Sequence, residues 1–143
     1  MSDLGLSMID ETVNETNHWL NLLGDRLGLD HQRAYHALRA GLHTLRDRLP
    51  VAEAAALGAQ LPHLVRGIYY DGWRPADVPE TTRSVAQYAE ALRGRLVDGN
   101  GPDPEATARA VFWLLDHNCG SGIMEKIRNA LPRDVAEELF DRA

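Results

Sequence analysis

The chain contains a single cysteine, Cys119, among its 143 residues. One cysteine excludes an internal disulfide and any CxxC-type zinc or redox site. Lysine is equally scarce: Lys126 is the only one, and it follows Glu125, so the phosphate-binding loop that ends in Gly-Lys-Ser/Thr is absent. No stretch approaches the roughly 18 apolar residues that a membrane-spanning helix needs. These absences exclude disulfide scaffolds, phosphate-loop enzymes and membrane-spanning proteins.

Basic residues are outnumbered, because 15 Lys and Arg face 21 Asp and Glu and the net charge is -6. An acidic chain is poorly suited to the phosphate backbone, so we expect no nucleic-acid partner. The first six residues carry neither the basic segment nor the apolar run of a secretory signal, and we expect a cytoplasmic protein. Hydrophobic residues make up 44% and charged residues 25%, which is typical of a globular domain.

Hydrophobic residues recur at helical spacing along most of the chain. One stripe steps by three, four or seven residues and consists of Ile9, Val13, Leu20, Leu23 and Leu27. A second stripe steps by four and three and consists of Leu38, Leu42, Leu45 and Leu49. Asp30 and the run Asp103-Pro104-Glu105 are typical helix starts. No segment alternates with a period of two. The sequence therefore predicts an all-α protein of about eight helices, packed as one compact bundle-like unit.

Two prolines in residues 74–80 predict a linker, because they cannot share one helix interior. The linker divides the chain into a first helical repeat, residues 1–73, and a second, residues 81–143. Within the second repeat, the Asp-Gly-Asn-Gly-Pro run at 98–102 predicts a further break between helices.

An internal repeat connects the two parts. Leu61-Pro62 and Leu131-Pro132 lie 70 residues apart, each between two short helical patterns. The same offset pairs Leu45 with Leu115 and Leu42 with Phe112, and an offset of 69 pairs Trp19 with Tyr88 and Leu23 with Leu92. Any two amphipathic helices can be aligned, but matched Leu-Pro junctions over four elements favour a duplication of two similar four-helix halves.

Residues 57–75, together with Ala130-Leu-Pro-Arg-Asp-Val135, closely resemble a bacterial family known as "domain of unknown function 2267". The resemblance extends over roughly residues 9 to 140. It implies a small, duplicated, all-helical domain in bacteria. It implies no established activity, cofactor or catalytic residue.

Metal-ligating patterns are weak. His36, His43 and Asp47 share a helix face, but the two histidines are two turns apart, and we expect a solvated polar face rather than a metal site. Glu15 and His18 form one Glu-x-x-His motif, which is half of what a di-iron site requires, and we expect both at the surface. We therefore predict no metal and no cofactor.

Catalytic and nucleic-acid motifs are equally thin. Cys119 lies at a predicted helix C-terminus, where the negative dipole end opposes thiolate formation. Ala54, Gly58 and Leu64 loosely match a helix-turn-helix, but its second helix would offer Arg66 as its only firm cation. We therefore expect neither an enzyme nor a DNA-binding protein.

The aromatic residues Tyr69, Tyr70 and Trp73 are the candidate interaction site, because aromatic side chains with a polar group are common at interfaces. They could instead fill the seam between the two halves.

Trp113 and Leu114 widen the apolar face of their helix, so we expect that helix to be buried on more than one side. The predicted function is a non-enzymatic cytoplasmic module for protein-protein interaction or scaffolding, with self-association as one form of it. The alternative is a small apolar ligand or acyl-chain binder with a pocket between the halves.

Overall fold

The computed structural model describes residues 2–96 and 101–142 and is helical throughout, with no strand in those ranges. The described ranges contain eight α-helices, a 3-10 turn (η1) and a π-helical turn (η2), in this order: α1 Ser2–Leu27, α2 His31–Asp47, α3 Val51–Gly58, α4 His63–Tyr70, η1 Pro75–Asp77, α5 Val85–Arg93, α6 Pro104–Asn118, α7 Ser121–Ala130, α8 Arg133–Val135 and η2 Ala136–Phe140. The all-α prediction is confirmed. The predicted break at 98–102 lies partly outside the described residues.

Side chains begin the helices where the sequence predicts. Asp30 accepts a hydrogen bond from the Arg33 backbone N–H (2.8 Å), which caps α2. Asp103 accepts one from the Ala106 N–H (2.9 Å), with Pro104 at the first position of α6. Each cap satisfies a backbone donor that the first helical turn leaves unpaired.

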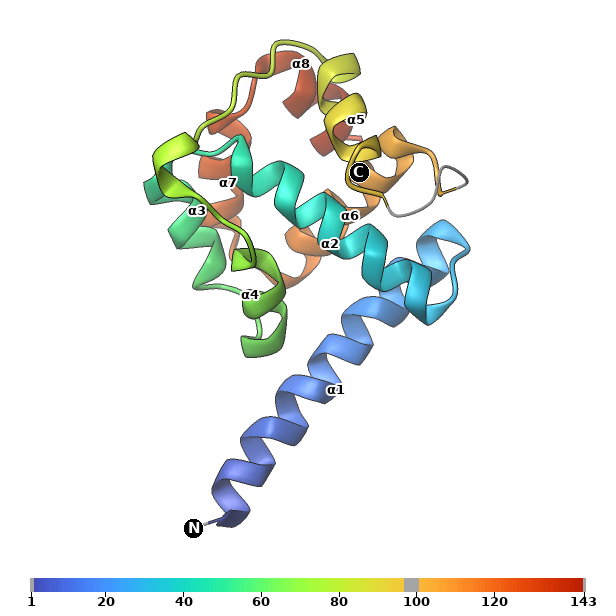
Figure 1. Cartoon of the computed structure of the whole chain (residues 1–143), viewed down its shortest axis with the longest axis vertical. Helices are drawn as coiled ribbons and strands as arrows, with labels where there is room; N and C mark the ends of the chain where they lie inside the picture. The colour runs from blue at the N-terminus through green and yellow to red at the C-terminus, as the bar shows by residue number, and fades with distance from the viewer. Residues whose placement is uncertain (1, 97–100, 143) are drawn as a thin grey trace.

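Helices α2 and α6 form the centre of the molecule (Figure 1). Residues 40–49 are all buried, which covers the whole C-terminal half of α2. The two helices approach closely at Gly41, where an added Cβ would lie 2.5 Å from Cγ2 of Val111. Leu114 is fully buried and Trp113 half-buried, so the expectation that α6 is buried on more than one side is confirmed.

The N-terminal part of α1 projects from the body (Figure 1). Trp19, Leu20 and Leu23 are buried against the other helices, whereas Ile9 is 58% exposed and Val13 41% exposed. The apolar stripe predicted along one helix face therefore continues beyond the body. The helix is longer than the surface on which it packs.

The segment between α4 and α5 is bound to the end of α2. The backbone N–H of Glu80 donates to the carbonyl of Asp47 (2.7 Å), and Nε of Arg48 donates to Oγ1 of Thr82 (2.9 Å). Residues 74–80, the predicted linker, thus run over the molecule between two anchored helices, and they include η1.

Candidate functional site

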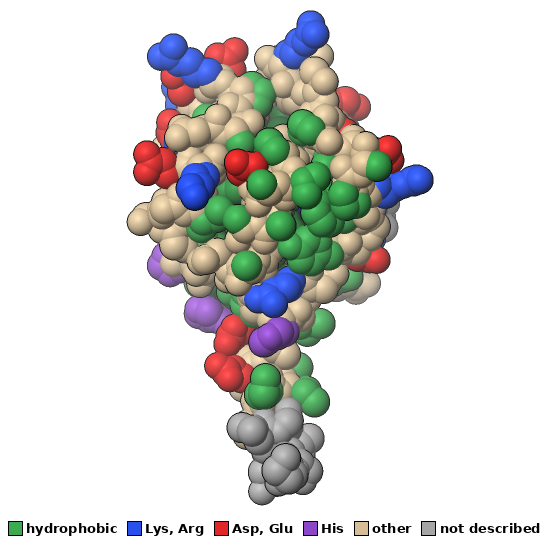
Figure 2. Space-filling model, turned by 90° about the vertical axis from the view of Figure 1, so that its left-hand side faces the viewer, with side chains coloured by type: hydrophobic (Ala, Val, Ile, Leu, Met, Phe, Trp, Pro, Cys, Tyr) green, Lys and Arg blue, Asp and Glu red, His purple; other side chains and the backbone are tan. Residues whose placement is uncertain are grey.

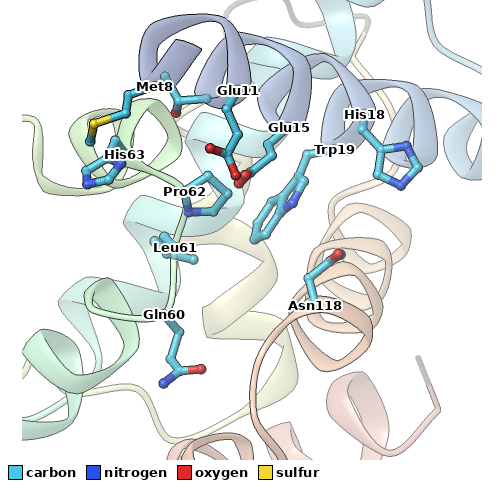
Figure 3. Close-up of a pocket in the computed structure, with 11 residues that line it drawn as sticks. Met8, Glu11, Glu15, His18, Trp19, Gln60, Leu61, Pro62, His63 and Asn118 are labelled. Carbon is cyan, nitrogen blue, oxygen red and sulfur yellow. The ribbon is translucent and has the colours of Figure 1, made fainter. Parts of the chain in front are cut away.

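A cavity of about 410 Å³ opens between α1, the junction of α3 with α4, and the end of α6 (Figure 3). Its lining combines acidic, aromatic and apolar side chains: Met8, Glu11, Thr12, Glu15, His18, Trp19, Gln60, Leu61, Pro62, His63 and Asn118. We call it the first cavity. Because its residues come from both predicted repeats, only the folded chain forms it.

Helical spacing brings the α1 residues to one wall. Met8, Thr12, Glu15 and Trp19 step by four, three and four, so they share one face of α1. Oγ1 of Thr12 accepts a hydrogen bond from the backbone N–H of Leu64 (2.9 Å), which ties this face to the first turn of α4. The opposite wall is the Leu-Pro junction that stood out in the sequence.

Two carboxylates dominate the charge of the first cavity. Figure 3 shows the side chains of Glu11 and Glu15 converging between Pro62 and Trp19. Within the described part of the chain, neither carboxylate has a basic side chain at ion-pair distance. Like charges one helical turn apart repel each other, so a cation between them would be stabilised.

A second cavity, of about 380 Å³, lies beside the junction of α7 with α8. It is lined by Arg48, Pro79, Glu80, Thr81, Thr82, Ala130, Leu131 and Pro132. The guanidinium of Arg48 contacts Glu80 (Nη2 to Oε2, 3.2 Å), Thr82 (2.9 Å) and the carbonyl of Thr44 (3.2 Å). Its Cζ lies 5.9 Å from the ring centroid of Tyr88, within cation–π range. This cavity therefore already holds a guanidinium that the chain itself supplies.

The face carrying His43 and Asp47 is buried rather than solvated, contrary to the prediction. His43 is 6% and Asp47 7% exposed, beneath α4, α5 and the segment between them. Nε2 of His43 hydrogen-bonds the carbonyl of Ile68 (2.6 Å), and Asp47 pairs with Arg46 (2.9 Å) and Arg95. A periodicity argument marks this face as polar but cannot see what covers it.

Burial, helped by neighbouring guanidinium groups, lowers the pKa of His43. Arg46 donates to the carbonyls of Tyr69 (2.7 Å) and Asp71 (2.8 Å), so it satisfies acceptors at the end of α4. His36 instead contacts the ring of Tyr35. No group of three His, Cys, Asp or Glu side chains in the described residues could hold a metal ion.

The predicted Glu-x-x-His pair is split between two environments. Glu15 is half-buried in the first cavity, whereas His18 is exposed at its rim. The surface position predicted for both residues therefore holds for His18, and Glu15 lies deeper than predicted.

The aromatic residues singled out in the sequence pack within the first half. Tyr69 is fully buried and its hydroxyl donates to the carbonyl of Ala54 (2.7 Å). Tyr70 and Trp73 are half-buried, with ring centroids 5.3 Å apart. Burial raises the pKa of Tyr69, because the charged phenolate is disfavoured there. Of the three, Tyr70 and Trp73 keep accessible surface for a partner.

The remaining candidates have structural surroundings. Arg66 is the cation that the second helix of the helix-turn-helix match would offer. Its guanidinium donates to the carbonyls of Gly58 (2.8 Å) and Leu61 (3.0 Å) and so stabilises the turn between α3 and α4. Cys119 follows the last residue of α6, and burial together with the charge of Asp116 raises the pKa of its thiol to about 11. A thiol with that pKa is a poor nucleophile at neutral pH.

Fold and site together define an all-helical protein with a central pair of crossing helices and an acidic, open cavity at the base of a projecting helix. None of its helices within residues 2–96 and 101–142 is long and apolar enough to cross a membrane. The chain belongs to the DUF2267 family of uncharacterized conserved proteins, whose model matches residues 16–138. The resemblance found in the sequence is thereby confirmed. No curated protein matches the chain.

Proposed function

We propose that the chain is a non-enzymatic cytoplasmic interaction module that binds a partner protein through the projecting part of α1. The observation that carries this proposal is the exposed apolar stripe of Ile9 and Val13, which are 58% and 41% exposed; Met8, 53% exposed, lies on the adjacent face. Figure 2 shows hydrophobic side chains on the projecting part of the molecule as well as on the body. An exposed apolar stripe that continues a buried one is typical of a surface that a partner covers.

The charge around the stripe selects the kind of partner. From Ser7 to Asp25 the helix carries Asp10, Glu11, Glu15 and Asp25 and no Arg or Lys. A second copy of the chain would bring like charges together, which disfavours self-association through this surface. A partner segment with apolar and basic side chains complements both features.

Two similar halves are part of the proposal. Leu61 and Leu131 are both buried and each precedes a proline that begins the next helix. Gly41 and Val111, which the offset of 70 pairs, meet where α2 crosses α6. The packing is reciprocal, since α1 lies on α6 and α5 lies on α2. A duplication with an approximate two-fold axis through the crossing accounts for these contacts.

The alternative, a binder of small ligands, keeps support from the first cavity, which both halves line. Glu11 and Glu15 in the lining favour a cationic group over the acyl chain that an apolar pocket would take. A small ligand would therefore be a cation.

The partner can be sought by cross-linking pull-down, and the binding then measured with the purified partner. Val13→Ser should weaken binding by about tenfold, because burial of a Val side chain contributes roughly 1.5 kcal/mol. Val51→Ser is the matched control, because Val51 is similarly exposed (45%, against 41% for Val13) but lies on α3. Equal binding by both variants would contradict the proposal.

Sedimentation of the purified chain tests whether a partner protein or a second copy of the chain covers the stripe on α1. We expect a monomer at micromolar concentration. If the chain is a dimer and Val13→Ser dissociates it, the proposal of a basic partner would be wrong, and the stripe would bind a second copy of the chain.

A further inference from the structure

We propose that the first cavity is a binding site for a guanidinium group, supplied by an arginine side chain of the partner protein. This inference rests on the function proposed above and names the group by which the partner is recognised. It draws on a comparison of the two cavities within the chain.

In the duplication proposed above, the two cavities occupy matching positions, one in each half. The offset of 70 that relates the Leu-Pro junctions pairs Leu61-Pro62 with Leu131-Pro132, and each pair lines its own cavity. The offset of 69 that relates Trp19 to Tyr88 also pairs Glu11 with Glu80 and Thr12 with Thr81. All four of the latter residues line the corresponding cavities. The two linings thus share a Leu-Pro junction and a Glu-Thr pair, although Glu11 and Thr12 lie within α1 and Glu80 and Thr81 in the segment before α5.

The second cavity shows what this arrangement binds. Arg48 enters it from the end of α2 with its side chain 7% exposed. Glu80 supplies the carboxylate and Tyr88 the aromatic ring. A carboxylate and an aromatic face are the two groups that recognise a planar, delocalised cation.

The first cavity has these recognition groups but lacks the arginine. The offset of 70 places Asn118 where the other half has Arg48. The Asn118 side chain is short and its Nδ2 donates to the carbonyl of Leu114 in its own helix (2.8 Å). In the first cavity Glu11 would supply the carboxylate, as Glu80 does in the second, and Trp19 would supply the aromatic ring, as Tyr88 does. Glu15 adds a second carboxylate. Figure 3 shows these side chains facing the cavity, with His18 and His63 toward opposite ends.

The position of the cavity suits an arginine carried by a protein. Met8 lines the cavity and is itself exposed, next to the stripe of Ile9 and Val13 on α1. A partner segment lying on the stripe would therefore place an adjacent arginine at the mouth of the cavity. The bound guanidinium would relieve the repulsion between Glu11 and Glu15.

Binding of small probes, followed by NMR shifts of the full chain, tests the chemistry without a partner. N-acetyl-arginine amide should shift resonances of Trp19 and Glu15, and N-acetyl-citrulline amide, its neutral isostere, should not. Glu15→Gln should weaken arginine binding by about tenfold, as expected for loss of a charge-assisted contact. Glu125→Gln, the same change at an exposed site on α7, should leave it unchanged. Equal shifts with arginine and citrulline, or equal affinity in both variants, would overturn the proposal.

A second variant fills the cavity from within. Asn118→Arg places an arginine at the position equivalent to Arg48, so it should raise the melting temperature and abolish binding of N-acetyl-arginine amide. Glu11→Gln in the same chain should remove the gain in melting temperature. If Asn118→Arg binds the probe as the wild type does, the cavity is not the guanidinium site.

Methylguanidinium distinguishes the two sources of the cation. Tighter binding of N-acetyl-arginine amide supports a protein-borne arginine, whereas equal or tighter binding of methylguanidinium overturns that source in favour of a small molecule. The result is independent of the Val13→Ser test. Loss of partner binding in Val13→Ser without probe binding would refute the guanidinium site alone, and probe binding without an effect of Val13→Ser would refute docking on the stripe alone.

Discussion

Replacement of Gly41 by alanine should destabilise the protein, although alanine is the better helix former. An added Cβ would lie 2.5 Å from Cγ2 of Val111 and 3.1 Å from its Cβ and Cγ1. Favourable carbon contacts are about 3.5–4.0 Å long, so the two central helices would have to separate by about 1 Å. Val111 cannot rotate away, because a β-branched side chain in a helix has one strongly preferred rotamer.

The magnitude follows from two opposing effects. Overpacking of a core costs about 1–3 kcal/mol. The helix propensity of alanine returns about 1 kcal/mol relative to glycine. The expected net effect of Gly41→Ala is therefore a loss of roughly 0–2 kcal/mol in the free energy of unfolding.

Gly67→Ala isolates the packing effect. Gly67 lies inside α4, and an added Cβ there would meet no atom within 4 Å. This control should gain about 1 kcal/mol. The two variants should thus differ by about 1–3 kcal/mol in their free energy of unfolding, measured by urea denaturation with circular dichroism as the readout. Val111→Ala added to Gly41→Ala should recover part of the difference. Equal stabilisation by both alanines would refute the close crossing of α2 and α6.

Three further predictions concern single side chains. The pKa of His43 is lower in the folded state than its ordinary value of 6.5. As the pH falls, the unfolded chain therefore binds a proton at this histidine before the folded chain does. The contribution of His43 to the free energy of unfolding should be fully present above about pH 6.5 and should decrease below it. His43→Gln should flatten this part of a stability-versus-pH curve. Trp73→Ala should cost about 2 kcal/mol in thermal melts, less than for a fully buried ring because Trp73 is half-buried; a cost under about 0.5 kcal/mol would show instead that the ring is free for a partner. Cys119, whose pKa is about 11, should react with iodoacetamide at pH 8 far more slowly than the same thiol in denatured protein.

Local patterns in the sequence were enough to predict the helices and several of their boundaries. The caps at Asp30 and Asp103 depend on hydrogen bonds between residues three apart, so a short segment contains all the information. The step of three and four among Leu38, Leu42 and Leu45 likewise marks a buried face from within one helix.

The candidate site was harder to predict, because its residues are far apart in the chain. Glu15, Leu61 and Asn118 meet only after α1, α3, α4 and α6 have packed. One signal was present in the sequence: the offset of 70 that pairs Leu61 with Leu131 also pairs Asn118 with Arg48. Its meaning depended on the burial of Arg48, which is a property of the fold.

The sequence by itself determined where helices form, because backbone hydrogen bonds and helical periodicity act over a few residues. Only the tertiary structure decided which polar and apolar faces are covered. It buried His43 and Asp47 beneath α4, α5 and the segment between them, and it left Ile9 and Val13 exposed beyond the body. Burial depends on which distant segment lies against a face, and the periodicity of one helix carries no information about its neighbours.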